Sequence, residues 1–171
     1  MTTKQFAVHP GGTNPDFIQL TGTIISWWAR TEGIMIQDVM CLRTQPFSTE
    51  IVKTKDFPRT TRDTIKHWAK LLLNAYNATN NEHQRIEIAK AASLELLQHR
   101  DRLVHSFWPY EQADHCKLVL SWIRPDKDAQ YGVQIGQYSV TVDELNDINQ
   151  RFANLYLEVM SISVNSARLY G

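Results

Sequence analysis

Apolar residues recur every three or four positions in four stretches of the chain, a spacing that predicts amphipathic helices. The first helix is expected at about residues 15–43, with Asn14 as its N-cap and Pro15 as its first residue. The stretch that follows contains two prolines and shows no sustained period, so it should be a connection. The residues of the first helix expected in the core are Phe17, Leu20, Ile24, Trp27 or Trp28, and Ile34.

The second and third helices are expected on either side of the turn-rich sequence NATNNE. The second helix begins near Thr61, and the third runs from Glu82 to about Phe107, before Pro109 stops it. If the turn between them is short, the two helices should be antiparallel. The apolar series of the second helix is Ile65, Trp68 or Ala69, Leu72 and Tyr76.

Residues 117–140 change to a strand-like pattern, with β-branched and aromatic residues on both sides of the turn sequence PDKDAQ. We predict a β-hairpin in which Val119 and Ile123 face the helices. Its exposed tip should consist of Pro125, Asp126, Lys127 and Asp128. Thr141 and Glu144 then form a capping box, which predicts a fourth helix over about 142–168. The apolar stripe of that helix is Leu145, Ile148, Phe152, Leu155, Val159 and Ile162.

Apolar helix faces of this kind cannot be buried singly, so the helices should pack together. We therefore predict an all-α fold: an antiparallel four-helix bundle with a β-hairpin inserted before the last helix. The length of 171 residues favours a single domain that spans residues 1–171.

The overall charge limits the classes of function. The chain has 18 basic and 18 acidic residues, so it lacks the global positive field of a protein that coats nucleic acid. Any contact with nucleic acid must then be local. No signal peptide or run of 18 apolar residues occurs, and we expect a soluble cytoplasmic protein without a membrane partner.

The sequence LQHRDRLVHSFW, residues 97–108, places charged residues within the third predicted helix. On an ideal helix, Arg100 shares its face with apolar residues such as Leu96 and Leu103. A guanidinium there is costly to bury unpaired, so it should meet a carboxylate or line a polar cleft. Glu32 of the first helix is a possible partner.

Asp101 and His105 lie four residues apart, so the carboxylate could accept a proton from the imidazole and fix its tautomer. His105 lies about 140° around the helix from Arg100, which suggests that a bend or a second chain completes any joint site. An arginine and a histidine suit phosphodiester cleavage of RNA without a metal or another cofactor. Arg100 would stabilise charge, Asp101 would orient, and His105 would transfer protons.

The stretch RDRLVHSFW resembles the R-x4–6-H motif of the HEPN superfamily. Arg100 matches the arginine of the motif, Asp101 the polar residue after it, and His105 the histidine, whereas many toxin-like members have asparagine where this chain has Asp101. The resemblance covers roughly residues 15–168. It implies a helical bundle that dimerises to form a composite site, hence a metal-independent endoribonuclease of the toxin or defence type. The implied partners are a second copy, RNA, and an antitoxin or nucleotidyltransferase.

Other interpretations remain open. Lys66, Lys70 and Arg102 are candidate RNA contacts, although the basic residues of 53–70 are also typical of a solvated loop and helix face. The histidines and Cys116 match no zinc-site spacing, so we expect no metal. Some HEPN members lack activity and serve as binding modules. The alternative function is therefore a non-catalytic dimerisation or partner-binding module, with Arg100 as a structural ion-pair residue.

Overall fold

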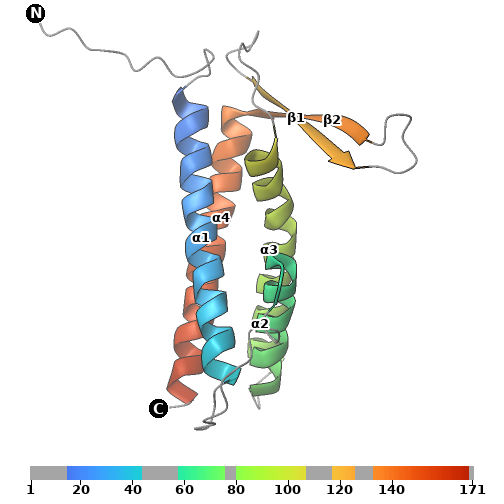
Figure 1. Cartoon of the computed structure of the whole chain (residues 1–171). Helices are drawn as coiled ribbons and strands as arrows, with labels where there is room; N and C mark the ends of the chain where they lie inside the picture. Colours follow the sequence, from blue (N-terminus) through green and yellow to red (C-terminus); the bar gives the residue numbers. More distant parts are fainter. Residues whose placement is uncertain (1–14, 44–57, 76–79, 107–116, 126–132, 170–171) are drawn as a thin grey trace, which may run out of the picture.

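The computed structural model describes residues 15–43, 58–75, 80–106, 117–125 and 133–169. These residues are mostly helical, with a two-stranded antiparallel hairpin directly before the last helix, as the sequence predicts. Figure 1 shows the long helices side by side and the hairpin at one end of them. In chain order the elements are α1 (Pro15–Arg43), α2 (Thr61–Ala75), α3 (Asn80–His105), β1 (Lys117–Pro125), β2 (Val133–Thr141) and α4 (Val142–Leu169).

Two helices begin with side-chain caps that satisfy their first backbone N–H groups. At α4, the Glu144 N–H donates to Thr141 Oγ1 (3.2 Å) and the Thr141 N–H donates to Glu144 Oε2 (2.7 Å), which confirms the predicted capping box. At α2, the Asp63 N–H donates to Thr60 Oγ1 (3.1 Å). α1 begins at Pro15 as expected, while Asn14 lies outside the described residues.

The core lies between the apolar faces of the four helices and one face of the hairpin. All six residues of the predicted α4 stripe are buried, as are Phe17, Ile24 and Trp28 of α1. Trp68 and Ala69 of α2, which the sequence pattern offers as alternatives for the core, are both buried. The predicted core residues of α1 that are only partly buried are Leu20, Trp27 and Ile34.

α1 and α4 run in the same direction, and they are the two helices that pack most extensively against each other. The rings of Trp27 and Tyr156 are in tilted contact, with centroids 5.2 Å apart. Farther along both helices, Ser163 Oγ donates to Asp38 Oδ1 at 2.6 Å. The residue numbers rise together, so the expectation that all neighbouring helices are antiparallel is wrong for this pair. The parallel direction is possible because the connection over residues 44–60 is long. It allows α2 to begin far from the C-terminal end of α1.

α1 and α2 also pack against each other in the same direction (Figure 1), so the antiparallel expectation is wrong for this pair too. The pairs that α3 forms with α4 and α2 are antiparallel, as predicted. α3 opposes α4, because Glu95 pairs with Arg151 whereas Arg85, earlier in α3, pairs with Glu158, later in α4. α2 and α3 also run in opposite directions (Figure 1). With 15 residues against 29 in α1 and 26 in α3, α2 covers only the part of these helices that lies far from the hairpin.

A buried carboxylate joins three of the helices. Asp38 of α1 is 8% exposed and accepts hydrogen bonds from Trp68 Nε1 of α2 (2.9 Å) and from Ser163 Oγ of α4 (2.6 Å). Burial raises the pKa of this carboxyl, and the two hydrogen bonds oppose that rise. Asp38 therefore fixes the relative position of α1, α2 and α4 at the end of the molecule far from the hairpin.

The hairpin forms where the sequence predicts it, but it faces the helices with the other set of side chains. Leu118 and Leu120 are fully buried, whereas Val119 is half-buried and Ile123 is 50% exposed. Side chains alternate between the faces of a strand, so an error of one residue reverses every assignment. The expectation for Val119 and Ile123 is therefore wrong. Of the predicted tip, Pro125 ends β1 and the three residues after it lie outside the described residues.

Candidate functional site

The predicted motif occupies the last two turns of α3, next to the hairpin. The face of Arg100 is the core face, as predicted, because the α3 residues buried there include Ser93, Leu96 and Leu103. Val104 is an exception at 39% exposure. The Arg100 side chain itself is 25% exposed, so its stem is largely withdrawn from water while part of its head remains accessible.

Arg100 pairs with the next residue in the chain. Its Nη1 donates to Asp101 Oδ1 at 2.9 Å, whereas its Nε is buried and has no hydrogen-bond partner among the described residues. An N–H left without a partner in a buried position costs free energy that a bound acceptor would recover. The guanidinium is thus only partly satisfied in this structure.

Glu32 is not the partner of Arg100, and that expectation is wrong. Glu32 Oε2 instead accepts a hydrogen bond from Trp28 Nε1 at 3.2 Å. At a rise of 1.5 Å per residue, Glu32 lies about 25 Å along α1 from Pro15, whereas Arg100 lies about 8 Å from the hairpin end of α3. The sequence carries no information about the relative height of two residues on different helices, so it could not exclude this pair.

The structure does not bring the three motif residues together. His105 is exposed at the last position of α3, and Asp101, engaged with Arg100, makes no hydrogen bond to His105 within the described part of the chain. Arg100 and His105 diverge around the helix, as its geometry predicts. A single chain therefore presents a paired arginine and a separate accessible imidazole.

A second polar group, which the sequence did not reveal, lies between α3, α4 and β2. We call Glu95, His99, Arg102, Tyr138 and Arg151 the seam cluster. Arg151 of α4 pairs with Glu95, and the guanidinium carbon of Arg102 lies 5.0 Å from the ring centroid of Tyr138 in β2. The only sign of the seam cluster in the sequence is the helical spacing of positions 95, 99 and 102, which places them on one face of α3.

The electrostatics of the seam cluster centre on His99. Burial lowers the pKa of its imidazole below the ordinary value, the charges of Arg102 and Arg151 lower it further, and Glu95 acts in the opposite direction. Its Nδ1 is buried and lacks a hydrogen-bond partner among the described residues. Burial also raises the pKa of the Tyr138 hydroxyl. Burial and the charges of Arg102 and Arg151 therefore all favour the neutral form of His99.

The remaining candidate RNA contacts do not converge on Arg100 and His105. Lys66 and Lys70 are exposed on α2, which accompanies only the part of α3 far from the hairpin (Figure 1). Arg102 lies near the motif in sequence but faces Tyr138. The structure therefore does not gather these three cations around Arg100 and His105.

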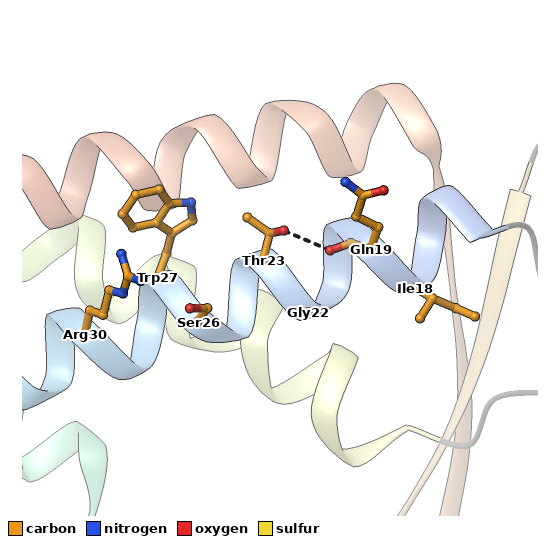
Figure 2. Close-up of a pocket in the computed structure, with 7 residues that line it drawn as sticks. All are labelled: Ile18, Gln19, Gly22, Thr23, Ser26, Trp27 and Arg30. Carbon is orange, nitrogen blue, oxygen red and sulfur yellow. Dashed lines mark hydrogen bonds between the residues drawn. The ribbon is translucent and has the colours of Figure 1, made fainter.

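A pocket of about 360 Å³ lies on the outer side of α1. Figure 2 shows that the side chains lining it all come from α1, between Ile18 and Arg30. Arg30 is the single ionisable residue in this lining, and its guanidinium carbon lies 5.4 Å from the ring centroid of Trp27. The pocket has no group suited to proton transfer and is separate from the motif.

Metal ligands do not cluster in the described ranges, where no group of three histidine, cysteine or acidic residues could hold an ion. None of the helices described is both long and apolar enough to cross a membrane. Comparisons with protein families, curated proteins and solved structures give no match to this chain.

Proposed function

We propose that this chain is a HEPN-like helical bundle that cleaves RNA without a metal, using Arg100, Asp101 and His105. The observation that carries the proposal is the state of Arg100. Its guanidinium is held on the core face of α3, its Nε lacks a partner among the described residues, and an accessible imidazole lies five residues away. This is the combination of anion stabilisation and proton transfer that phosphodiester cleavage requires.

The pairing of Arg100 with Asp101 describes the resting protein. A phosphate that binds Arg100 replaces Asp101 as the partner of the guanidinium, since charge-assisted hydrogen bonds to phosphate are strong and often bidentate. Asp101 is then free to accept a hydrogen bond from the imidazole N–H of His105, four residues on, and to fix its tautomer. His105 removes the 2′-hydroxyl proton or protonates the leaving oxygen.

The active unit in this proposal is a two-fold dimer, because Arg100 and His105 of one chain diverge. The support is the region of α1 and α3 that α2 leaves uncovered near the hairpin. Ile25 of α1 and Val104 of α3 are 38% and 39% exposed, and each lies on the half of its helix nearer the hairpin. A second copy seated on this region would bury these apolar side chains and bring the two motifs together.

In this proposal the protein acts in the cytoplasm on RNA and is controlled by an antitoxin or a nucleotidyltransferase partner. A second candidate function is a non-catalytic module that binds a partner protein. The ion pair between Arg100 and Asp101 favours it, because a neutralised arginine with an intrahelical partner serves structure without catalysis.

The test is RNA cleavage by purified wild type and by His105→Ala. We expect the variant to lose cleavage and to keep its fold, since His105 is exposed. Arg100→Ala should lower activity by about 10²-fold or more per folded molecule. The matched control is His83→Ala, an exposed histidine near the other end of α3, which should cleave as wild type does. Equal cleavage by wild type and His105→Ala would reject the catalytic role and leave the binding module.

A further inference from the structure

The seam cluster brings two arginines, a histidine and a tyrosine from three elements to one place beside the motif. We infer that the seam cluster is a second phosphate site, which holds a phosphate group of the RNA strand on the other side of α3 from Arg100. The identification of the phosphate carrier as RNA rests on the proposed function. The phosphate chemistry rests on the contacts and charges of the cluster.

Arg102 has the donors that such a site needs. It has no carboxylate within ion-pair distance among the residues described, and its guanidinium lies over the ring of Tyr138 at 5.0 Å. The Arg102 side chain also hydrogen-bonds Tyr138, and the other N–H donors of the guanidinium remain for oxygen ligands. Arg151 adds a second cation, which Glu95 offsets in the free protein. The cluster therefore carries one uncompensated positive charge.

His99 lies within the field of both guanidiniums, because the charges of Arg102 and Arg151 each lower the pKa of its imidazole. An anion bound between the two arginines would offset both fields and favour the protonated ring. Protonation would in turn add a third positive charge opposite the phosphate. His99 is thus both a contributor to the site and a reporter of its occupancy.

The two sites lie on different faces of the same helix. Arg100 and Arg102 are about 160° apart around α3, and the helix with its side chains is about 10–12 Å across. His105 is exposed at the last position of α3. Around the end of this helix, it lies between the face of Arg102 and the face of Arg100. A strand that crosses the end of α3 would therefore pass the seam cluster and His105 of one copy, and in the proposed dimer it would meet Arg100 of the other copy.

The first measurement is an NMR titration of the histidine ring protons with inorganic phosphate, with His99 assigned from His99→Gln. We expect phosphate to raise the pKa of His99 in wild type and to have no such effect in Arg102→Gln. The other charged or titratable groups that act on this ring are Glu95 and Arg151. An unchanged His99 titration in wild type would overturn the phosphate site.

The second measurement is binding of a single-stranded 2′-O-methyl oligonucleotide, which lacks the hydroxyl needed for cleavage. Arg102→Gln and Arg151→Gln should each weaken binding by about tenfold and reduce its salt dependence by about one counterion. Glu95→Gln should tighten binding a few-fold, a gain that misfolding cannot produce. Arg30→Gln is the matched control, because Arg30 also stacks on an aromatic ring but lies on α1.

The outcomes separate this inference from the proposed function. If wild type does not cleave RNA but phosphate raises the pKa of His99 and the seam variants lose oligonucleotide binding, the catalytic role fails and the seam site stands. If cleavage requires His105 while phosphate leaves the His99 titration unchanged and all seam variants bind as wild type does, the seam site is wrong. If phosphate shifts His99 but the oligonucleotide binds all variants equally, the assignment to RNA is overturned in favour of a small phosphate ligand.

Discussion

Asp38 connects α1, α2 and α4 through its two hydrogen bonds, and its raised pKa has a consequence for stability. The folded state holds this proton more tightly than the unfolded chain, where the pKa is about 3.8. The free energy of unfolding should therefore fall as pH rises from about 4 through the folded pKa. We expect Asp38→Asn to remove this fall, as measured by urea unfolding between pH 4 and 7. The same pH dependence in both proteins would contradict the assignment.

Gly136 of β2 lies opposite Trp122 of β1, and the indole occupies the space of a side chain at this position. A Cβ atom at residue 136 would lie 2.1 Å from Trp122 Cζ2. Because the ring would have to move, Gly136→Ala should lower the free energy of unfolding by roughly 1–3 kcal/mol. Chemical denaturation measures this change, and near-UV circular dichroism should report the displaced indole.

Gly22 provides the matched control for this prediction. It is exposed on α1, and a Cβ there would meet nothing within 4 Å. Gly22→Ala should instead raise the free energy of unfolding by about 0.5–1 kcal/mol, because alanine is the better helix former. If both substitutions had the same sign, the contact between Trp122 and residue 136 would not control stability.

At the scale of elements, the cap of α4 can be tested directly. Thr141→Ala removes the Oγ1 acceptor for the Glu144 N–H and should cost about 1 kcal/mol in the free energy of unfolding. Thr23→Ala is the control, since Thr23 Oγ1 donates back to the Gln19 carbonyl within α1 and caps nothing. A loss in Thr23→Ala as large as in Thr141→Ala would show that the cap has no special role.

The ends of the helices were predictable because local chemistry determines them. Pro15 starts α1, and Thr141 with Glu144 starts α4, so neighbours in sequence are enough. The direction of α1 relative to α4 was not predictable, because it depends on where the chain returns after residue 43. The hairpin register failed for a related reason: Leu118 and Val119 both suit a buried face, and only the packed helices choose between them.

The candidate site was predictable only in part. The position of Arg100 on the core face follows from helical geometry, and the structure places it there. The seam cluster was not predictable, because it includes Tyr138 and Arg151, which come from elements that are distant in sequence from α3. Their approach to α3 is set by tertiary packing, so one helical pattern could not reveal it.

At the scale of the whole molecule, the proposed dimer gives a test that uses mixed variants. If each site takes Arg100 from one copy and His105 from the other, a mixture of inactive Arg100→Ala and His105→Ala proteins should recover about a quarter of wild-type cleavage. Half of randomly paired dimers are mixed, and each has one intact site. Mixtures that remain inactive, although the subunits exchange, would contradict a composite site.

The proposed contact surface can be tested separately. Ile25→Glu and Val104→Glu should each convert the dimer to a monomer in sedimentation analysis at micromolar concentration, because a charge would be buried in the interface. Ile88→Glu is the control, since Ile88 is 58% exposed on a part of α3 far from the motif. A monomeric wild type would remove the basis of this prediction.

The parallel pairing of α1 with α4 also constrains how the protein is made. During synthesis on the ribosome, α1 emerges early, but the helix that covers most of its apolar face is translated after the hairpin. Contacts between residues this far apart in the sequence form late and lower the folding rate of the chain. The apolar face of α1 that carries Phe17, Ile24 and Trp28 is therefore not covered by α4 until α4 leaves the exit tunnel, and transiently exposed apolar surface of this kind is prone to aggregate.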